Sequence, residues 1–130
     1  MQSDPKQCLY CTNNQTLKDL MIEFAQLRVS RAFVFKEQTY YGRCLVAYKD
    51  HVSELVDISD EERNLFFADV AQAAKAIHKA FHPDKVNYGA YGDGGCHLHF
   101  HLVPKYADGF EWKTVFQMNP GAVYLTDEAY

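Results

Sequence analysis

Apolar residues recur every three or four positions in the middle of the chain, a period typical of a helix with one buried face. Ser59 and Glu62 form a capping-box pattern just before this stripe, and Pro83 stands just after it. We therefore predict one long helix that begins after Ser59 and ends before Pro83. Its buried stripe consists of Phe66, Val70, Ala73, Ile77 and Phe81.

A second helical pattern lies nearer the N-terminus. Leu17, Leu20, Met21 and Phe24 are spaced as one face of a helix, and Thr16 is a suitable N-cap. We predict a short helix there. It follows a polar N-terminal segment, residues 1–15, that carries a Cys-x-x-Cys knuckle.

Short runs of β-branched and aromatic residues, separated by turns, predict four strands. Two form a hairpin before the long helix and two follow it. We expect Pro104 to end the last strand and the tail, residues 105–130, to be irregular. This order indicates an α+β fold, an antiparallel β-sheet with the long helix packed on one side. The predicted strands are 28–36, 43–48, 86–91 and 96–103.

Length and composition indicate one globular domain over residues 1–130, because 48% of the residues are hydrophobic. The net charge of −4 argues against a nucleic-acid polymer as partner, since a phosphate backbone needs a basic surface. No apolar stretch is long enough to span a membrane, and residues 1–5 lack the features of a signal peptide. We therefore expect a cytoplasmic location.

The segment 97–103, His-Leu-His-Phe-His-Leu-Val, carries the strongest chemical signal. In a strand, alternate side chains share a face, so the three imidazoles line one face and the apolar residues the other. Three hydrogen-bonded histidines on a half-buried sheet, or a purely metal-binding row, are the alternatives. Three groups that titrate near neutrality beside a glycine-rich turn, residues 92–95, favour a reactive site.

The cysteines suggest a metal site. In a reducing compartment, Cys8-x-x-Cys11 is more often a metal or redox motif than a disulfide, and a tetrahedral metal needs two further ligands. His78 and His82, one turn apart on the long helix, are one candidate pair, although surface histidines are the simpler interpretation of them. An empty or redox-active Cys-x-x-Cys is the other alternative.

The segment from Gly42 to His51, then a capped helix, then His-φ-His-φ-His-φ-φ with φ apolar, resembles the histidine-triad (HIT) family. The resemblance runs from about Cys8 to Pro104. It implies a homodimer that binds a small nucleotide substrate and cleaves or transfers at the α-phosphorus. Dinucleoside polyphosphates and nucleoside phosphoramidates are the implied substrate types.

The resemblance also implies residue roles. The middle histidine, His99, attacks phosphorus and forms a nucleotidyl-histidine that water resolves. His101 binds the phosphate oxygens or acts as the acid/base partner. The zinc-containing subgroup with an N-terminal Cys-x-x-Cys implies a structural Zn²⁺. Its ligands here are Cys8, Cys11, His51 and His97.

Three positions depart from the family pattern. Phe35 stands where many members carry the acid that binds ribose, with Glu37 two residues later as a substitute. Asp93 replaces a Gln or Asn near the phosphate, and Asn87 is a further candidate phosphate or sugar contact. We therefore assign substrate binding to Asn87, Asp93, His99 and His101. A nucleotide-binding or scaffolding module with little turnover is the alternative function, and transfer to a sugar phosphate is a third.

Overall fold

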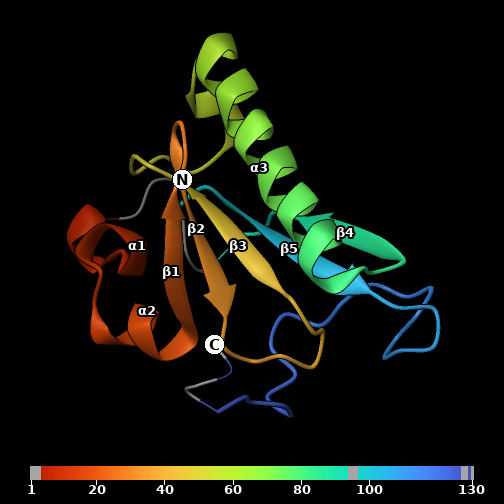
Figure 1. Ribbon diagram of the computed structural model, residues 1–130. Helices are drawn as coiled ribbons and strands as arrows, with labels where there is room; N and C mark the ends of the chain where they lie inside the picture. Colours follow the sequence, from red (N-terminus) through yellow and green to blue (C-terminus); the bar gives the residue numbers. More distant parts are fainter. Residues whose placement is uncertain (1–3, 94–96, 127–128, 130) are drawn as a thin grey trace.

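The computed structural model describes residues 4–93, 97–126 and 129. A five-stranded sheet in the order β1-β2-β3-β5-β4, with every neighbouring pair antiparallel, forms the centre (Figure 1). The α+β prediction is confirmed. The strands are β1 (Met21–Gln26), β2 (Ser30–Phe35), β3 (Cys44–Tyr48), β4 (Lys85–Gly89) and β5 (His99–Lys105).

The long helix α3 (Asp60–Phe81) packs against one face of the sheet (Figure 1). It begins where predicted, because the Ser59 hydroxyl accepts a hydrogen bond of 3.1 Å from the Glu62 N–H. It ends at His82, whose left-handed backbone (φ 51°) lets its N–H donate to the His78 carbonyl just before Pro83. Apolar residues of α3 and of β3, β4 and β5 form the first core between helix and sheet. It includes Val46, Phe66, Val70, Ile77, Val86 and Leu102.

The opposite face of the sheet carries a second, smaller core beneath the N-terminal segment. Two short helices, α1 (Leu9–Thr12) and α2 (Gln15–Leu20), pack on the first strands there. Two single 3-10 turns, η1 (Pro5–Gln7) and η2 (Leu55–Asp57), complete the helical elements. This second core consists of Tyr10, Leu17, Met21, Phe33, Phe35, Leu45 and Ala47.

The predicted N-terminal helix is wrong beyond Leu20. Asn14, not Thr16, caps α2, and residues 21–26 form the edge strand β1. The apparent helical stripe does not share one face: Met21 is buried, whereas Phe24 is 52% exposed. Pairing with β2 supplies backbone hydrogen bonds and buries alternate residues, and this tertiary gain overrides the local helical spacing.

Strand β5 also differs from the prediction. It begins at His99 and continues through Pro104 to Lys105, while Cys96 lies outside the described residues. The pairing with β3 stops at Leu102, and from there β5 pairs with β4 alone. A proline is tolerated in that stretch because one side of the strand needs no backbone donor. Strand β4, which precedes it, covers residues 85–89 where residues 86–91 were predicted. It therefore begins one residue earlier and ends two residues earlier than expected.

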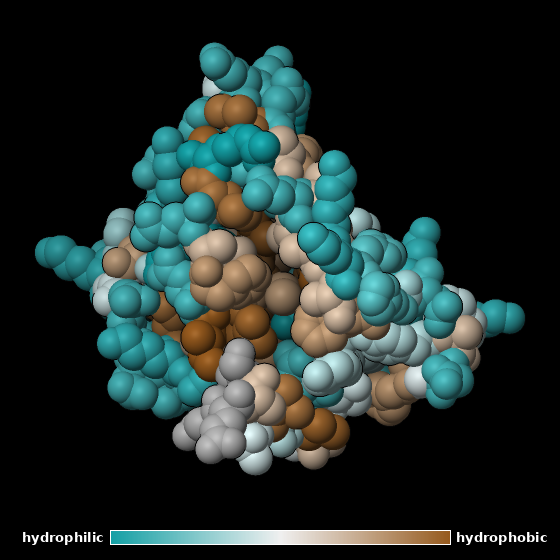
Figure 2. Space-filling model, viewed as in Figure 1, coloured by the Kyte–Doolittle hydropathy of each residue, from teal (hydrophilic) through white to brown (hydrophobic). Residues whose placement is uncertain are grey.

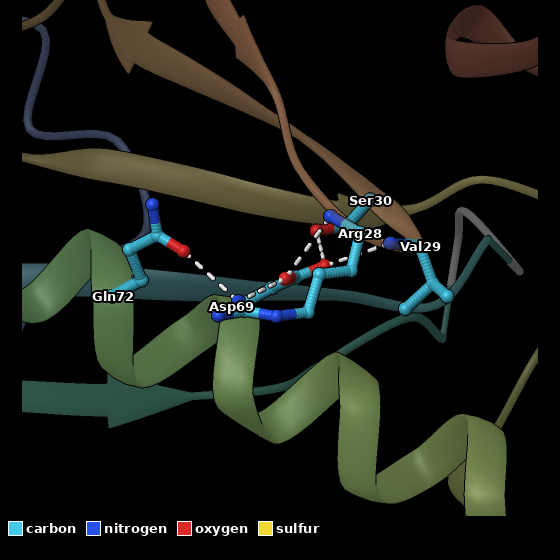
Figure 3. A network of polar contacts seen from close by, with 5 residues as sticks. All are labelled: Arg28, Val29, Ser30, Asp69 and Gln72. Atoms are coloured by element: carbon cyan, nitrogen blue, oxygen red, sulfur yellow. Dashed lines mark hydrogen bonds and ion pairs between the residues drawn. The ribbon is translucent and has the colours of Figure 1, made fainter.

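A buried carboxylate fastens α3 to the turn between β1 and β2 (Figure 3). Asp69 is 0% exposed and accepts hydrogen bonds from the backbone N–H groups of Arg28 (3.2 Å) and Val29 (2.9 Å). It also accepts from the Ser30 hydroxyl at 2.8 Å and pairs with the Arg28 guanidinium at 3.0 Å. Four donors compensate for the loss of water around this charge.

Apolar side chains remain at the surface over β1 and β2, beside α3, in the face that Figure 2 shows. Ile22 and Phe24, 36% and 52% exposed, belong to β1. None of the helices in the described part of the chain is both long enough and apolar enough to cross a membrane.

Replacement of the buried carboxylate tests this attachment. Asp69→Asn keeps the shape but replaces one accepting oxygen by an NH₂ group, so we expect unfolding free energy to fall by about 2–4 kcal/mol. Asp60→Asn, at a carboxylate that is 89% exposed and pairs with Arg63, is the control and should cost less than about 1 kcal/mol. Urea denaturation followed by circular dichroism measures both. Equal losses would contradict the role given to Asp69.

Candidate active site and metal-binding cluster

The alternation around β5 separates reactive from apolar side chains. Leu98 and Leu102 are buried in the core beneath α3, and Phe100 packs against that core. His97, just before the strand, and His99 and His101 within it all line a cavity of about 370 Å³ on the opposite face. This volume suits a small organic ligand.

The walls of this cavity are largely apolar and come from elements far apart in the chain. The N-terminal helices supply one wall, strands β1 to β3 the floor, and the C-terminal tail another wall. Polar side chains besides the histidines come from Gln7 and Asn119. The apolar members are Leu9, Leu20, Met21, Phe35, Leu45 and Met118, with Tyr10 beside them.

His99 is oriented by its neighbour. The Nδ1 of its ring lies 2.7 Å from the His97 carbonyl oxygen, and because a carbonyl only accepts, Nδ1 carries the hydrogen. Nε2 therefore keeps a free lone pair. Burial of the ring lowers the pKa of His99 below its ordinary value, which the hydrogen bond to the carbonyl offsets in part. The ring is therefore neutral at neutral pH, with the lone pair on Nε2.

His101 is held in the complementary tautomer. A guanidinium nitrogen of Arg43 lies 3.0 Å from its Nδ1, and because arginine only donates, Nδ1 accepts and Nε2 carries the hydrogen. Burial lowers the pKa of His101 to about 3, with further lowering by the Arg43 charge and by His99. With ring centroids 5.3 Å apart, His99 and His101 thus offer a lone pair and an N–H side by side.

A second cluster adjoins the first through His97. The ligand atoms of Cys8, Cys11, His51 and His97 all lie within 4.8 Å of one another. The Cys8 sulfur lies 3.3 Å from Nδ1 of His97, and the Cys11 sulfur lies 3.3 Å from Nδ1 of His51. A tetrahedral zinc holds sulfur and nitrogen ligands about 3.5 Å apart. Two thiols and two imidazoles at this spacing could therefore hold a metal ion.

The orientation of His97 fits the same purpose. Its Nε2 lies 2.6 Å from the Tyr48 carbonyl oxygen and donates to it, so Nδ1 faces the cysteine sulfurs without a hydrogen. Such a backbone partner behind a ligating histidine fixes both the tautomer and the ring direction. The alternative pair, His78 and His82, is exposed on α3 and belongs to no such cluster in the described residues.

Comparison with known proteins agrees with this geometry. The HIT domain model matches residues 17–108, most of the chain. The chain belongs to the histidine-triad family. It is 30% identical over 102 residues to adenosine 5'-monophosphoramidase hnt1 of Schizosaccharomyces pombe, covering 70% of this chain and 72% of that protein. It is 33% identical over 92 residues to Protein hit of Bacillus subtilis, covering 64% and 63%.

Solved structures of HIT proteins share the fold. A histidine triad protein of Bradyrhizobium japonicum superposes with a TM-score of 0.80 over 89% of this chain and 87% of its own, at 18% identity. One from Marinobacter aquaeolei has a TM-score of 0.79 at 16% identity and covers 88% of this chain and 84% of its own. At such identities the likeness concerns the fold alone.

The two other substrate-binding candidates of this HIT domain lie apart from the 370 Å³ cavity. Asp93 lines a neighbouring cavity of about 660 Å³ with Glu54 and Tyr91, and His99 borders both cavities. Asn87 lines a third cavity, of about 270 Å³, beside Lys105. Gly94 and Gly95 of the glycine-rich turn lie outside the described residues.

Phe35 and Glu37 have separate roles. Phe35 lines the cavity, whereas the Glu37 carboxylate, 2% exposed, accepts from the N–H groups of Ala122 and Val123, both at 2.7 Å. It also accepts from the backbone and hydroxyl of Thr39. Burial works against ionisation, but these donors outweigh it and lower the pKa of Glu37. Glu37 therefore fastens the C-terminal tail and does not reach the cavity, so it is no substitute for a ribose-binding acid.

Sequence reasoning missed Arg43 and the tail. Arg43 opens an apolar strand and gave no sign that its charge would be fully buried beside a histidine. Met118 and Asn119 lie in the tail, which carries no periodic pattern, yet they complete the cavity. Tyr10, whose ring centroid lies 5.4 Å from that of His99, followed from no motif either.

Proposed function

We propose that this HIT protein hydrolyses nucleotide conjugates at the α-phosphorus, with His99 as the nucleophile and nucleoside phosphoramidates as the preferred class. The observation that carries the proposal is the hydrogen bond from Nδ1 of His99 to the His97 carbonyl, because it leaves Nε2 free to attack. The names of two yeast relatives, adenosine 5'-monophosphoramidases of Schizosaccharomyces pombe and Saccharomyces cerevisiae, support the choice of phosphoramidates.

In the proposed reaction, Nε2 of His99 forms a bond to phosphorus while the bond from phosphorus to the amine breaks. Water then attacks the nucleotidyl-histidine, releases the nucleotide and restores the neutral ring. The departing amine takes up a proton from solvent in the first step, and the attacking water returns one to solvent in the second, so the two steps balance. The N–H of His101 donates to a non-bridging phosphate oxygen, where negative charge develops. The apolar walls around Phe35 and Leu45 receive the base.

The alternative, a binding module with little turnover, is less well supported. A module needs no neutral imidazole with an exposed lone pair beside an N–H donor. Burial and orientation of His99 and His101 are costly for folding, and catalysis explains the cost. Asp93, in the cavity that His99 also borders, is proposed to contact a part of the substrate beyond the phosphate. Asn87 lines a cavity that shares no residue with the other two, so we propose no substrate contact for it.

Removal of the nucleophile separates the two functions. His99→Ala should lower the hydrolysis of adenosine 5'-phosphoramidate at least about 10³-fold, because no other group can form the covalent intermediate. His78→Ala removes an exposed imidazole on α3 and should leave the rate unchanged. The rates are measured as release of AMP, detected by chromatography. A diadenosine polyphosphate serves as a second substrate in the same assay. Binding of AMP without turnover in the unaltered protein would favour the module instead.

We also propose that the four-residue cluster binds a structural Zn²⁺. The ligands are Cys8 and Cys11 at α1, His51 after β3 and His97 before β5. Thiolate and imidazole are the ligands that zinc prefers, and a closed set of four matches a structural site. The ion would join the N-terminal knuckle to the histidine segment and so stabilise one wall of the cavity.

The metal proposal is tested by composition and stability together. Protein purified without chelator should carry about one zinc per chain by elemental analysis. Cys11→Ser should lose the ion and lower the melting temperature, whereas Cys44→Ser, at a buried thiol of the core between α3 and the sheet, should keep the ion. Absence of metal from the unaltered protein would overturn the ligand set.

Finally, we propose a homodimer formed at the β4 edge of the sheet. Tyr88 lies on β4, the edge strand, which has no second strand partner among the described residues, and is 52% exposed. Phe67 of α3 is 40% exposed and packs on Phe100 of the neighbouring strand β5, with ring centroids 5.7 Å apart. Analytical ultracentrifugation should give twice the mass of one chain for the unaltered protein. Tyr88→Glu should lower this mass toward that of a single chain, whereas Phe24→Glu, on the edge strand at the other side of the sheet, should leave it unchanged. A monomer in the unaltered protein would contradict this.

A further inference from the structure

Arg43 is a buried cation without an acidic partner. Its side chain is 0% exposed, and among the described residues no carboxylate lies within ion-pair distance of it. Its Nε has no hydrogen-bond partner in the part of the chain that the structure describes. Burying an unpaired charge is strongly unfavourable, so a protein that retains one gains something from it.

The guanidinium is held in one orientation. One terminal nitrogen donates to the Gln117 carbonyl at 2.9 Å, and the other lies 3.0 Å from Nδ1 of His101. Aromatic rings enclose its planar group: the Phe35 centroid lies 4.5 Å from the central carbon, and that of Phe116 lies 5.2 Å from it. Burial lowers the pKa of Arg43 to about 10, so the group stays charged at neutral pH.

We propose that Arg43 is the positioning residue of this site, holding His101 as a neutral Nε2–H donor and placing a positive charge behind that ring, where it favours a bound phosphate without contacting it. The proposal rests on the proposed function for the identity of the anion, but its structural part stands on the contacts of Arg43 alone. Its consequence for the chemistry is that His101 acts as a hydrogen-bond donor rather than as an imidazolium acid.

Apart from Arg43, the described residues that pack around His101 carry no charge that acts strongly on it. Its neighbours across the sheet are Leu45 on β3 and Gly89 on β4, and the rings of Phe35 and Phe116 flank it. None of these four is charged. His99 is the remaining titratable group that acts on it. Arg43 is therefore the charged side chain that decides the protonation of His101, together with burial.

The contacts of Arg43 also connect His101, the proposed hydrogen-bond donor to the phosphate, with the C-terminal tail. Through the Gln117 carbonyl, the same guanidinium holds the segment that brings Met118 and Asn119 to the cavity wall. Lys105 provides a matched control, because it is 2% exposed and donates to tail carbonyls of Glu111 (2.6 Å) and Thr114 (2.7 Å), yet no contact joins it to His101.

The test compares Arg43→Gln, Arg43→Lys and Lys105→Met by ¹⁵N NMR of the histidine rings. In the unaltered protein, His101 should be the Nε2–H tautomer and stay neutral down to pH 5. In Arg43→Gln, which keeps a donor without charge, its pKa should rise by at least about one unit. Arg43→Lys, which keeps the charge, should show a smaller rise, and Lys105→Met should show none.

Binding and turnover provide independent measurements. AMP should bind Arg43→Gln about tenfold more weakly, and kcat/KM should fall about 10²-fold. The Nδ1–H tautomer in the unaltered protein, or a pKa of His101 that Arg43→Gln does not move, would overturn the proposal. If Arg43→Gln fails to fold, the tautomer in the unaltered protein and the Arg43→Lys titration decide. Ring NMR needs no turnover, so an inactive protein with the expected tautomer would refute the proposed hydrolysis and leave the role of Arg43 supported.

Discussion

His97 connects the Cys8–Cys11–His51 cluster with His99, the first by its ring and the second by its backbone carbonyl. Its ring lies between the Tyr48 carbonyl and the cysteine sulfurs, and its backbone carbonyl accepts the hydrogen of the His99 ring. A shift of His97 would therefore change both the spacing of the metal-ligand candidates and the tautomer of the neighbouring histidine. The N-terminal knuckle, besides lining the cavity, is thus linked to the orientation of the His99 ring through His97.

The apolar residues of the same segment supply the stability that its histidines do not. Leu98 and Leu102 bury their side chains beneath α3, which frees the opposite face of the segment for imidazoles that contribute little to folding. Asp69 accepts hydrogen bonds from four donors of residues 28–30, so α3 is attached to the turn that joins β1 and β2 as well as to the sheet. The larger core thus lies on one face of the sheet, and the histidine-lined cavity lies on the other, beside the smaller core.

Two histidines two residues apart differ in their tautomers because their partners differ. A carbonyl, which only accepts, places the hydrogen of His99 on Nδ1, and an arginine, which only donates, places that of His101 on Nε2. Both rings stay neutral because burial disfavours the imidazolium form, and Arg43 adds to this at His101. The site therefore presents a free lone pair on one ring and an N–H group on the other, with both rings neutral.

The sequence by itself determined the α+β class, the long helix from Ser59 and the family, because alternation, capping and a histidine motif are local patterns along the chain. It did not determine strand β1, since the residues from Met21 to Phe24 fit a helix until β2 pairs with them. The burial of Arg43 and the cavity wall at Met118 were decided only by the tertiary structure. Those contacts join residues more than 50 positions apart, and a charge is costly or useful only once its surroundings are known.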